Sequence, residues 1–491
     1  MLPTNSNSTK TFLGHPRGLA TLFFTEMWER FSYYGMRAIL LFYMFYSVMD
    51  GGLGFTKAQA ASIMSIYGAL VYLTSVLGGF ISDRIWGSRR TVLYGGILIM
   101  LGHIVLAIFT GRIALYVSIG LITLGTGMLK PNVSEMVGEL YDKNNYRREN
   151  GFNIFIFGIN MGAFIAPIIV GYMGQTYNFH IGFSIAAIGM FFGLIQYMID
   201  GKKYLSSDSL FPTAPLEPEE VKSLARKIFI WIIGIILIGT VMTAFNILSI
   251  LNIITVLSIL TIIIPIYYFI VMIVSKKTSN QERRKVFSYI PLFLAAIMFW
   301  IIEEQGSVTL AIFAEEQTKL TIFGHSFPAS WFQSLNPLFI MICVPVFIFL
   351  WKKMKNNQPS APTKFSIGLF FAGISFLWMM IPGIVFGTGK LVSPIWLIVS
   401  WILVIIGEMF ISPIGLSTTT QLAPKAFKSQ MMSMWFLSDA VAQAINAQIV
   451  KLYSQDTEIL YFGILGIISI IFGIILFSFS KRIKIFMTIK K

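Results

Sequence analysis

The chain has almost no cysteine and few charged residues for its length. Cys343 is the only cysteine among 491 residues, so no disulfide can form within the chain. Charged residues make up 12% of the sequence and hydrophobic residues 56%. A soluble protein of this size could not cover its surface with so few charges. The shortage of charge therefore excludes a soluble globular protein and favours one that is embedded in a lipid bilayer.

Sequence motifs of catalysis are also missing. The chain contains no HExxH, no GxSxG and no Walker A motif, and residues 387–390 lack the first glycine and the hydroxyl residue of the last of these. We expect no metal and no organic cofactor, and we do not expect an enzyme. A sensor or scaffold stays possible, although the sequence shows no soluble output domain. Residues 1–18 are polar and the apolar run after them is too long for a cleaved signal peptide.

Long apolar runs repeat along the whole chain. About 20 helical residues cross the hydrocarbon core of a bilayer. Fourteen spans are expected, near residues 19–48, 57–82, 91–110, 113–139, 150–174, 180–200, 226–247, 250–275, 287–314, 329–351, 365–385, 393–420, 428–453 and 458–480. The expected fold is an all-α integral membrane protein with 14 transmembrane helices.

Acidic residues are scarcer than basic ones, which gives a net charge of +15. Of the 37 Lys and Arg residues, 29 fall in the two termini and in alternate loops, five on the opposite side, and three inside spans. This positive-inside bias predicts that both termini are cytoplasmic and that the chain is a multi-pass protein of the cell membrane. Since topology accounts for the basic charge, no patch remains for nucleic acid.

Two segments interrupt the regular series of spans. Residues 201–225 are polar, contain three prolines and are expected to form a cytoplasmic linker. The next two spans carry no charge between Ile228 and Ser275, which suits a lipid-facing pair. Without 201–285, six spans precede and six follow, in the arrangement of major facilitator transporters, whose substrate site lies between two bundles. The expected domains are an N-terminal six-helix bundle, an inserted segment and a C-terminal six-helix bundle with its tail, over residues 1–200, 201–285 and 286–491.

The loop after the second span resembles the GxxxDRxxGRR loop of the same superfamily. It contains Asp83 and Arg84 between Gly79 and Arg90. We expect Asp83 to pair with a basic group or a helix end and to hold one conformation closed. The alternative is an ordinary basic inner loop with turn glycines.

The first span carries ionisable residues at membrane depth. Glu26, Arg30, Tyr33 and Arg37 fall within about 60° of one another on a helix, and Glu29 lies beside them. Charge at this depth is costly and usually marks an ion or substrate pathway. This helix must therefore line water or face a second bundle.

Other ionisable residues lie inside later spans. Lys130 adds a third cation in the first half, and the second half supplies four acids: Glu303, Glu304, Glu408 and Asp439. We expect ion pairs that form and break as two halves move. Static buried pairs are the alternative, although such pairs are often no better than apolar packing. Either role stays open for Glu135 and Glu139.

Amphipathic aromatic and amide residues share this depth. Each could simply pack in the core, but together they suit a binding site. They are Tyr33, Tyr34, Tyr67, Asn160, Trp300, Asn336 and Trp435.

Several blocks then resemble one family, the proton-coupled oligopeptide transporters, specifically its bacterial di- and tripeptide permeases. The similar segments, in order, are EMWERF with YYGMR in 26–37, FNIFIFGINMG in 152–162, EEQG in 303–306, QSLNP in 333–337 and GE in 407–408. The resemblance extends from residue 14 to about residue 480. It implies a monomeric symporter in the lipid bilayer that imports di- and tripeptides together with protons.

The resemblance also implies roles for residues. Arg37 and Lys130 would bind the peptide carboxylate, and Glu408 would bind its amino group with Asn160 and Asn336. The side-chain pockets would be lined by Tyr33, Tyr34, Tyr67, Trp300 and Trp435. Proton coupling would use Glu26, Glu29, Arg30 and Glu303. The gating pairs would be Arg37 with Glu304 and Lys130 with Glu408.

Two features depart from the family pattern. Asp439 stands where a small neutral residue is more usual, and the second span lacks the histidine of animal members. The chemistry still suits a peptide, because a zwitterion needs opposite charges a few ångströms apart. Two other transporters are possible: an exporter of cationic drugs, which has little need of three buried cations, and an anion porter, which has little need of the acids in the first span.

Overall fold

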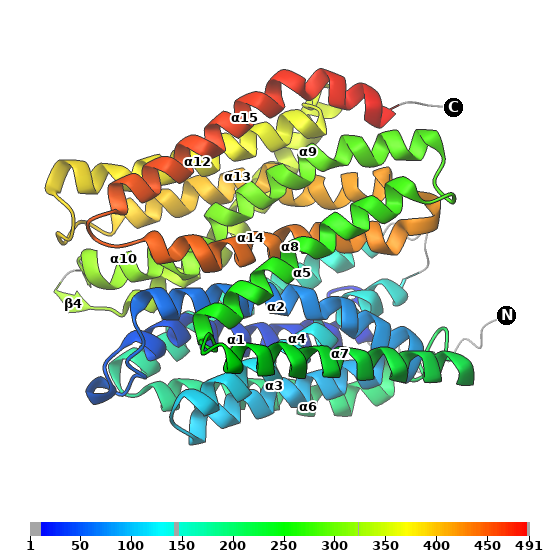
Figure 1. Ribbon diagram of the computed structural model, residues 1–491, viewed down its shortest axis with the longest axis horizontal. Coiled ribbons are helices and arrows are strands. Elements are labelled where there is room, and N and C mark those ends of the chain that lie inside the picture. The colour runs from blue at the N-terminus through cyan, green and yellow to red at the C-terminus, as the bar shows by residue number, and fades with distance from the viewer. Residues whose placement is uncertain (1–10, 142–146, 323, 489–491) are drawn as a thin grey trace.

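A computed structural model describes residues 11–141, 147–322 and 324–488, which are almost entirely helical. The long helices are α1 Arg17–Phe45, α2 Lys57–Ile81, α3 Ser88–Ile108, α4 Arg112–Glu139, α5 Arg147–Thr176, α6 Phe179–Tyr204, α7 Pro218–Ala244, α8 Ile250–Val274, α9 Asn280–Glu303, α10 Thr309–Gln317, α11 Leu335–Met354, α12 Ala361–Phe386, α13 Ile395–Leu422, α14 Lys428–Ile449 and α15 Glu458–Thr488. Figure 1 shows them running roughly side by side.

The helix α9 continues through the 3₁₀ turn η4, Glu304–Ser307, into α10, so these three elements form one span. Within the described residues the chain therefore has the fourteen spans expected from the sequence. Twelve of them are recognised from length and hydropathy alone. The other two, α1 and α14, contain several charged and polar residues, which lower their mean hydropathy.

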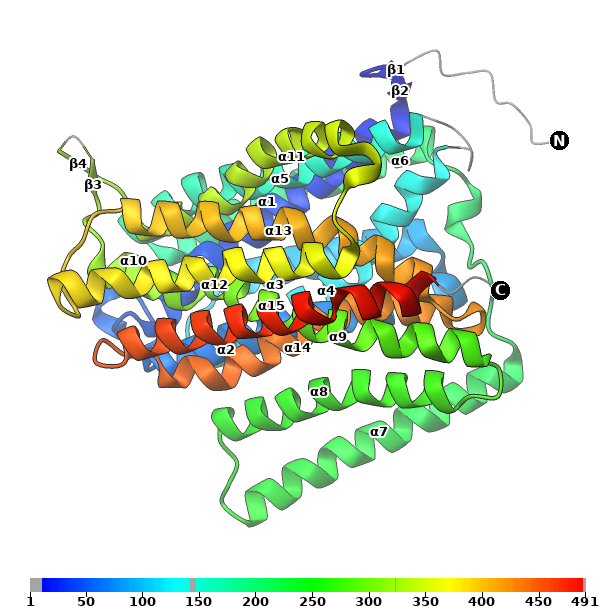
Figure 2. The same cartoon turned by 90° about the horizontal axis from the view of Figure 1, so that it is seen from above.

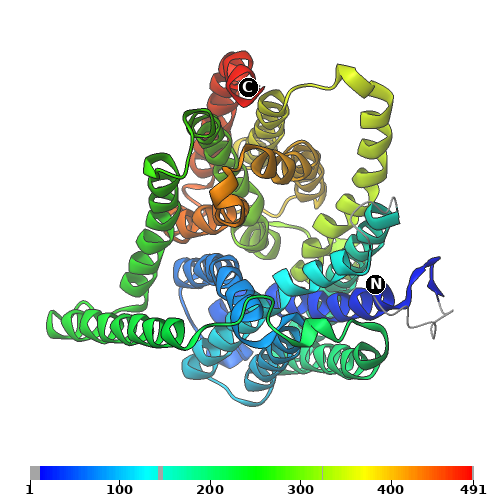
Figure 3. The same ribbon diagram turned by 90° about the vertical axis from the view of Figure 1, so that its right-hand side faces the viewer.

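The helices gather into two bundles, which Figure 3 shows end-on. In the first, α1 packs against α5 and α6, while α3 packs against α4 and α6. In the second, α12 packs against α13 and α15, and α9 packs against α14. Contacts between the bundles run chiefly through α2 with α14, and through α5 with α11 and the 3₁₀ helix η5, Ala329–Ser334.

The helices α7 and α8 lie outside both bundles (Figure 2). α7 exposes nearly all its side chains, whereas α8 packs against α14 and α2. The expected linker over 201–225 is shorter than predicted, because α6 extends to Tyr204 and α7 starts at Pro218. Proline suits the first helical turn, and Glu217 and Glu220 form a reciprocal cap there.

Two short hairpins mark opposite ends of the molecule. β1, Thr11–Phe12, pairs with β2, His15–Pro16, at the same end of the molecule as the C-terminal end of α15; we call this the terminal end (Figure 2). β3, Thr321–Ile322, pairs with β4, His325–Ser326, at the opposite end, which we call the far end. His15 looks like a loop residue in the sequence, but it is buried and bonded to the Tyr141 hydroxyl at 2.9 Å.

Candidate functional site

A cavity of about 90 Å³ lies where the two bundles meet. This volume accommodates several water molecules, or one polar group of a larger ligand. Its polar lining comes from α1, α5, the α9–η4 junction, η5 and α11. The main lining residues are Arg37, Asn160, Glu303, Glu304, Gln333 and Asn336. The cavity is therefore built from both bundles and carries both signs of charge.

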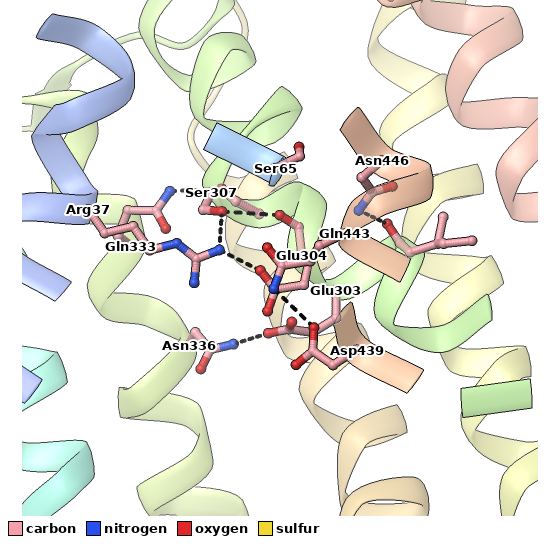
Figure 4. A network of polar contacts seen from close by, with 12 residues as sticks. Arg37, Ser65, Glu303, Glu304, Ser307, Gln333, Asn336, Asp439, Gln443 and Asn446 are labelled. Atoms are coloured by element: carbon pink, nitrogen blue, oxygen red, sulfur yellow. Dashed lines mark hydrogen bonds and ion pairs between the residues drawn. The ribbon is translucent and has the colours of Figure 1, made fainter. Parts of the chain in front are cut away.

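An ion pair crosses this cavity from one bundle to the other (Figure 4). Arg37 Nη2 on α1 lies 2.5 Å from Glu304 Oε2 in η4, and it donates to Ser307 Oγ at 2.9 Å. Gln333 stabilises the η4 turn, because its side-chain amide donates to the Gly306 carbonyl at 2.7 Å. Arg37 and Glu304 are thus in contact, as their expected gating role requires.

Glu303 faces the same cavity, although it has a different partner. Asn336 Nδ2 on α11 donates to Glu303 Oε1 at 2.7 Å (Figure 4). The helix α9 ends at this residue, and the 3₁₀ turn that follows points the two successive carboxylates at different partners. Glu303 is therefore held within the second bundle, while Glu304 reaches the first.

The three charged residues Glu26, Glu29 and Arg30 form a compact buried group on α1, which we call the triad. Arg30 Nε lies 3.3 Å from Glu26 Oε1 and also bonds to Glu29, and all three residues are at most 3% exposed. Among the described residues, one oxygen of each acid and Arg30 Nη2 have no hydrogen-bond partner. Unpartnered buried polar atoms are costly. The triad therefore suits a transient ligand such as a proton or a water molecule.

Close packing holds the triad inside the first bundle. A Cβ at Gly162 of α5 would lie 2.2 Å from the Met27 carbonyl oxygen, so α1 and α5 approach backbone to backbone. The Arg30 guanidinium also lies 5.1 Å from the centre of the Tyr33 ring and 5.9 Å from that of Tyr34. These contacts fix the cation on one helix face.

The other expected gating pair is not formed. No carboxylate forms an ion pair with Lys130 in the described part of the chain, and its ammonium instead lies 4.5 Å from the centre of the Tyr72 ring. Glu408 lies on α13, which packs on α11, α12, α14 and α9 rather than on α4. Its Oε2 is buried without a hydrogen-bond partner among the described residues. Lys130 and Glu408 are therefore not paired in this conformation, and their gating role stays a prediction.

The expected aromatic residues fall into two groups. Tyr34 lines the cavity, whereas Tyr33 and Tyr67 are almost fully buried and their ring centres lie 6.1 Å apart. Trp300 and Trp435 form a second group, with ring centres 6.3 Å apart. Among the described residues, the Trp300 indole nitrogen has no hydrogen-bond partner.

Sequence reasoning missed Ser307, Gln333 and Tyr72. The first two are bound into the turn that carries Glu304. Tyr72 follows Gly68 by four residues, so both lie on the face of α2 that packs against α14. That spacing is a signal in the sequence.

The loop residues Asp83 and Arg84 lie near the terminal end, where they contact the connection between α6 and α7; their role in holding one conformation closed stays a prediction. Asp83 pairs with no basic group among the described residues: its carboxylate accepts a 3.4 Å hydrogen bond from Thr213. Arg84 forms a 2.5 Å ion pair with Glu220 at the start of α7. Backbone bonds from Ala214 and Leu216 complete the contact. The loop therefore anchors the connection between α6 and α7.

At the far end, polar contacts join the two bundles beyond the cavity. Lys57 pairs with Glu316, and Glu315 accepts hydrogen bonds from Tyr46 and Gln175. The Trp331 indole also donates to the Ile168 carbonyl at 3.1 Å. These contacts hold the two bundles together at the far end, which is closed in this conformation.

The site is suited to binding charged groups of a ligand. Within the part of the chain that the structure describes, no group of three or more His, Cys, Asp or Glu residues could hold a metal ion. The cavity instead offers a guanidinium, carboxylates and amides, which bind charged and hydrogen-bonding ligands.

Comparison with known proteins identifies the family. The model of the POT family matches residues 89–483. The "Uncharacterized transporter YclF" of Bacillus subtilis (strain 168) is 51% identical, over 97% of this chain and 96% of its own length. The "Di-/tripeptide transporter" of Lactococcus lactis subsp. cremoris is 50% identical, over 98% of both chains. A crystal structure of the peptide transporter POT in complex with sulfate matches with a TM-score of 0.95 at 51% identity, over 97% of both chains. The expected membrane-transporter fold of the major facilitator type is confirmed, and the chain belongs to the POT family.

Proposed function

We propose that this protein is a proton-coupled symporter that imports di- and tripeptides by alternating access. The observation that carries the proposal is the cavity between the bundles, with Arg37 on one wall and Glu303 and Glu304 on the other. A peptide zwitterion needs opposite charges at its two ends. Support also comes from the Lactococcus relative, which is named a di-/tripeptide transporter and is half identical over nearly the whole chain.

The peptide would be held mainly by its ends. Arg37 and Lys130 bind the carboxylate, while Glu408 binds the ammonium with help from Asn160 and Asn336. The unpartnered buried oxygen of Glu408 supports this role, because a buried acceptor gains most from an arriving donor. Recognition of the ends leaves peptide side chains to a roomy aromatic wall, which permits broad selectivity.

That aromatic wall consists of Tyr33, Tyr34, Tyr67, Trp300 and Trp435. Aromatic side chains provide large contact surfaces that suit side chains of different size. Tyr34 lines the cavity in this conformation. Tyr33 packs against Tyr34 and Tyr67, while Trp300 and Trp435 form a separate pair, and these four would contact longer side chains when the bundles move.

Proton coupling would use the triad together with Glu303. Burial disfavours the charged form of a carboxylate, so a proton can occupy these acids without strong acid outside. Protonation of Glu26 or Glu29 would release one partner of Arg30. Protonation of Glu303 would change its bond to Asn336 in the cavity wall. Protons and peptide would thereby act on connected elements.

The direction of import follows from which end opens. We propose that the terminal end faces the cytoplasm of a cell whose plasma membrane the chain spans, as the distribution of Lys and Arg predicts. The far end, with its bonds between bundles, is then closed toward the outside. Opening it would require Arg37 to leave Glu304.

The chain would work as a monomer with three parts. Residues 1–200 and 286–491 form the two moving bundles, and residues 201–285 form the linker and the inserted helix pair. The bonds of Asp83 and Arg84 to residues 213–220 would tie this linker to the first bundle.

Uptake into proteoliposomes tests the proposal. Purified protein is reconstituted, and labelled Ala-Ala is supplied with acid outside and neutral buffer inside. We expect accumulation above the external concentration and its loss when a protonophore is added. Accumulation that is unchanged by the protonophore would contradict coupling, and an absence of Ala-Ala uptake would contradict peptide transport.

A further inference from the structure

A close contact between α2 and α14 lies one helical turn from a buried acid, Asp439. A Cβ at Gly68 of α2 would lie 1.6 Å from the side-chain oxygen of Gln443, so this amide occupies space that only a glycine leaves free. Gln443 Nε2 donates to Asp439 Oδ1 at 3.0 Å (Figure 4). Both residues are at most 4% exposed. The position of the Asp439 carboxylate is therefore fixed where the two bundles touch.

Asp439 also reaches across to the first bundle. Asp439 lies one helical turn before Gln443, and Tyr72 lies one turn after Gly68 on the same face of α2, so the two side chains lie near each other across the contact between α14 and α2. The ring face of Tyr72 lies 4.5 Å from Lys130 Nζ. A continuous series of contacts thus runs from α14 through α2 to α4.

Lys130 differs from the other two buried cations of the first bundle. Arg30 and Arg37 each pair with a carboxylate, whereas Lys130 forms no ion pair with any residue that the structure describes. A buried carboxylate beside a phenol makes the ring more electron-rich, since neighbouring polar groups polarise one another at low dielectric. Such a ring attracts an ammonium more strongly. The charge of Asp439 can therefore act on Lys130 through Tyr72, without direct contact.

We propose that Asp439 is a positioning residue that acts through Tyr72 to hold the Lys130 ammonium where the carboxylate of the peptide binds. This inference rests on the proposed peptide transport. It gives a task to a buried acid that the proposed function does not use, and it assigns the positioning of Lys130 in this conformation to Tyr72 and Asp439 instead of Glu408. Because α14 belongs to the second bundle, movement of the bundles would release Lys130 together with its ligand.

The test compares two ligands that differ only at the carboxyl end. Inhibition constants of Ala-Ala and of its C-terminal amide are measured against counterflow of labelled Ala-Ala in proteoliposomes. The proteins are wild type, Asp439→Asn, Tyr72→Phe and the double variant. Loss of part of a desolvated cation–π contact is expected to weaken Ala-Ala binding by roughly 3- to 30-fold in each single variant. The amide, which gives Lys130 no carboxylate to bind, is expected to bind each variant within about twofold of wild type.

The double variant distinguishes positioning from independent contacts. If Asp439 acts through Tyr72, the double variant is no weaker than the weaker single variant. Matched controls are Asp50→Asn in an exposed turn and Tyr94→Phe on an exposed face of α3, and neither should change either constant. Monodispersity and thermal unfolding of each variant show whether it is folded.

Two results would overturn the inference while leaving peptide transport intact. One is an equal loss for Ala-Ala and its amide, which would mean that the variants disturb the site generally. The other is a loss of Ala-Ala affinity in the double variant that equals the product of the two single-variant losses, which would mean that Asp439 and Tyr72 act separately. A wild-type protein that does not bind Ala-Ala would instead contradict the proposed function, and the inference with it.

Discussion

The buried charges form two groups, which differ in how far apart the paired residues lie in the sequence. In the triad, Arg30 pairs with residues one and four positions away on the same helix. At the cavity, Arg37 pairs with Glu304, which is 267 positions away in the other bundle. A rigid movement of the bundles leaves the first group intact but must break the second. This difference suggests that the triad responds to protons and the Arg37–Glu304 pair responds to movement.

Arg30→Ala should produce the largest effect, because it removes the cation from the triad. Two buried acids would then face each other without compensation, and breaking a buried ion pair in this way costs about 3–5 kcal/mol. We expect no measurable transport and a clearly lower unfolding temperature in detergent. Uptake of labelled Ala-Ala and thermal unfolding measure the two effects.

The control for this variant is Arg30→Lys, which keeps the charge. It should unfold close to the wild-type temperature. Adding Glu29→Gln to Arg30→Ala should recover part of the lost stability by removing one uncompensated acid. If Arg30→Ala transports and unfolds like the wild type, the buried charge of the triad has no function.

Glu304→Gln should have a smaller effect, on the closure of the far end. A neutral amide still bonds to Arg37 but no longer forms an ion pair, so separation of the bundles becomes easier. We expect the population open at the far end to rise by about tenfold, which corresponds to roughly 1.4 kcal/mol. Replacing the one cysteine with Cys343→Ser allows spin labels at Ser47→Cys and Ser326→Cys, on opposite bundles at the far end.

Distances between these labels report the opening directly. The same pair of labels in a protein with Glu304 intact serves as the reference. A distance distribution that Glu304→Gln leaves unchanged would show that the ion pair does not hold the far end closed.

Ser307→Ala should have the smallest effect in this series. It removes one 2.9 Å hydrogen bond to Arg37 but leaves the ion pair in place. A hydrogen bond to a charged group contributes about 1.5–3 kcal/mol, and the remaining pair should offset most of the loss. We expect turnover of Ala-Ala to change by less than about fivefold. The control is Ser417→Ala on an exposed turn of α13, and an effect of Ser307→Ala larger than that of Glu304→Gln would reverse the proposed ranking.

Charge at membrane depth made much of the site predictable from the sequence. Glu26, Arg30 and Arg37 interrupt an apolar run, and their helical spacing places them on one face. Fourteen spans follow from the apolar runs in the same way. The pairing of Arg37 with Glu304 came from family resemblance, since no periodicity relates residues that lie so far apart in the chain.

Contacts that depend on the conformation could not be predicted. Lys130 and Glu408 carry opposite charges at similar depth, yet α4 and α13 do not pack together here. Tyr72 was missed because tyrosines at 67 and 72 look alike in the sequence, and only the packing of α2 against α14 distinguishes them. The start of α7 at Pro218 was not predicted, because the first two turns of this helix are polar and the expected span began only with the apolar residues after them.

The most direct test of the account measures two activities in the same proteoliposomes. Accumulation of labelled Ala-Ala driven by a proton gradient is compared with its counterflow at equal pH, for wild type, Glu29→Gln and Glu304→Gln. The account predicts that Glu29→Gln loses accumulation but keeps counterflow. Glu304→Gln should slow both activities by the same factor and still reach the wild-type level of accumulation. A folded Glu29→Gln protein that concentrates the peptide, or a Glu304→Gln protein that loses accumulation alone, would contradict the division between coupling and gating.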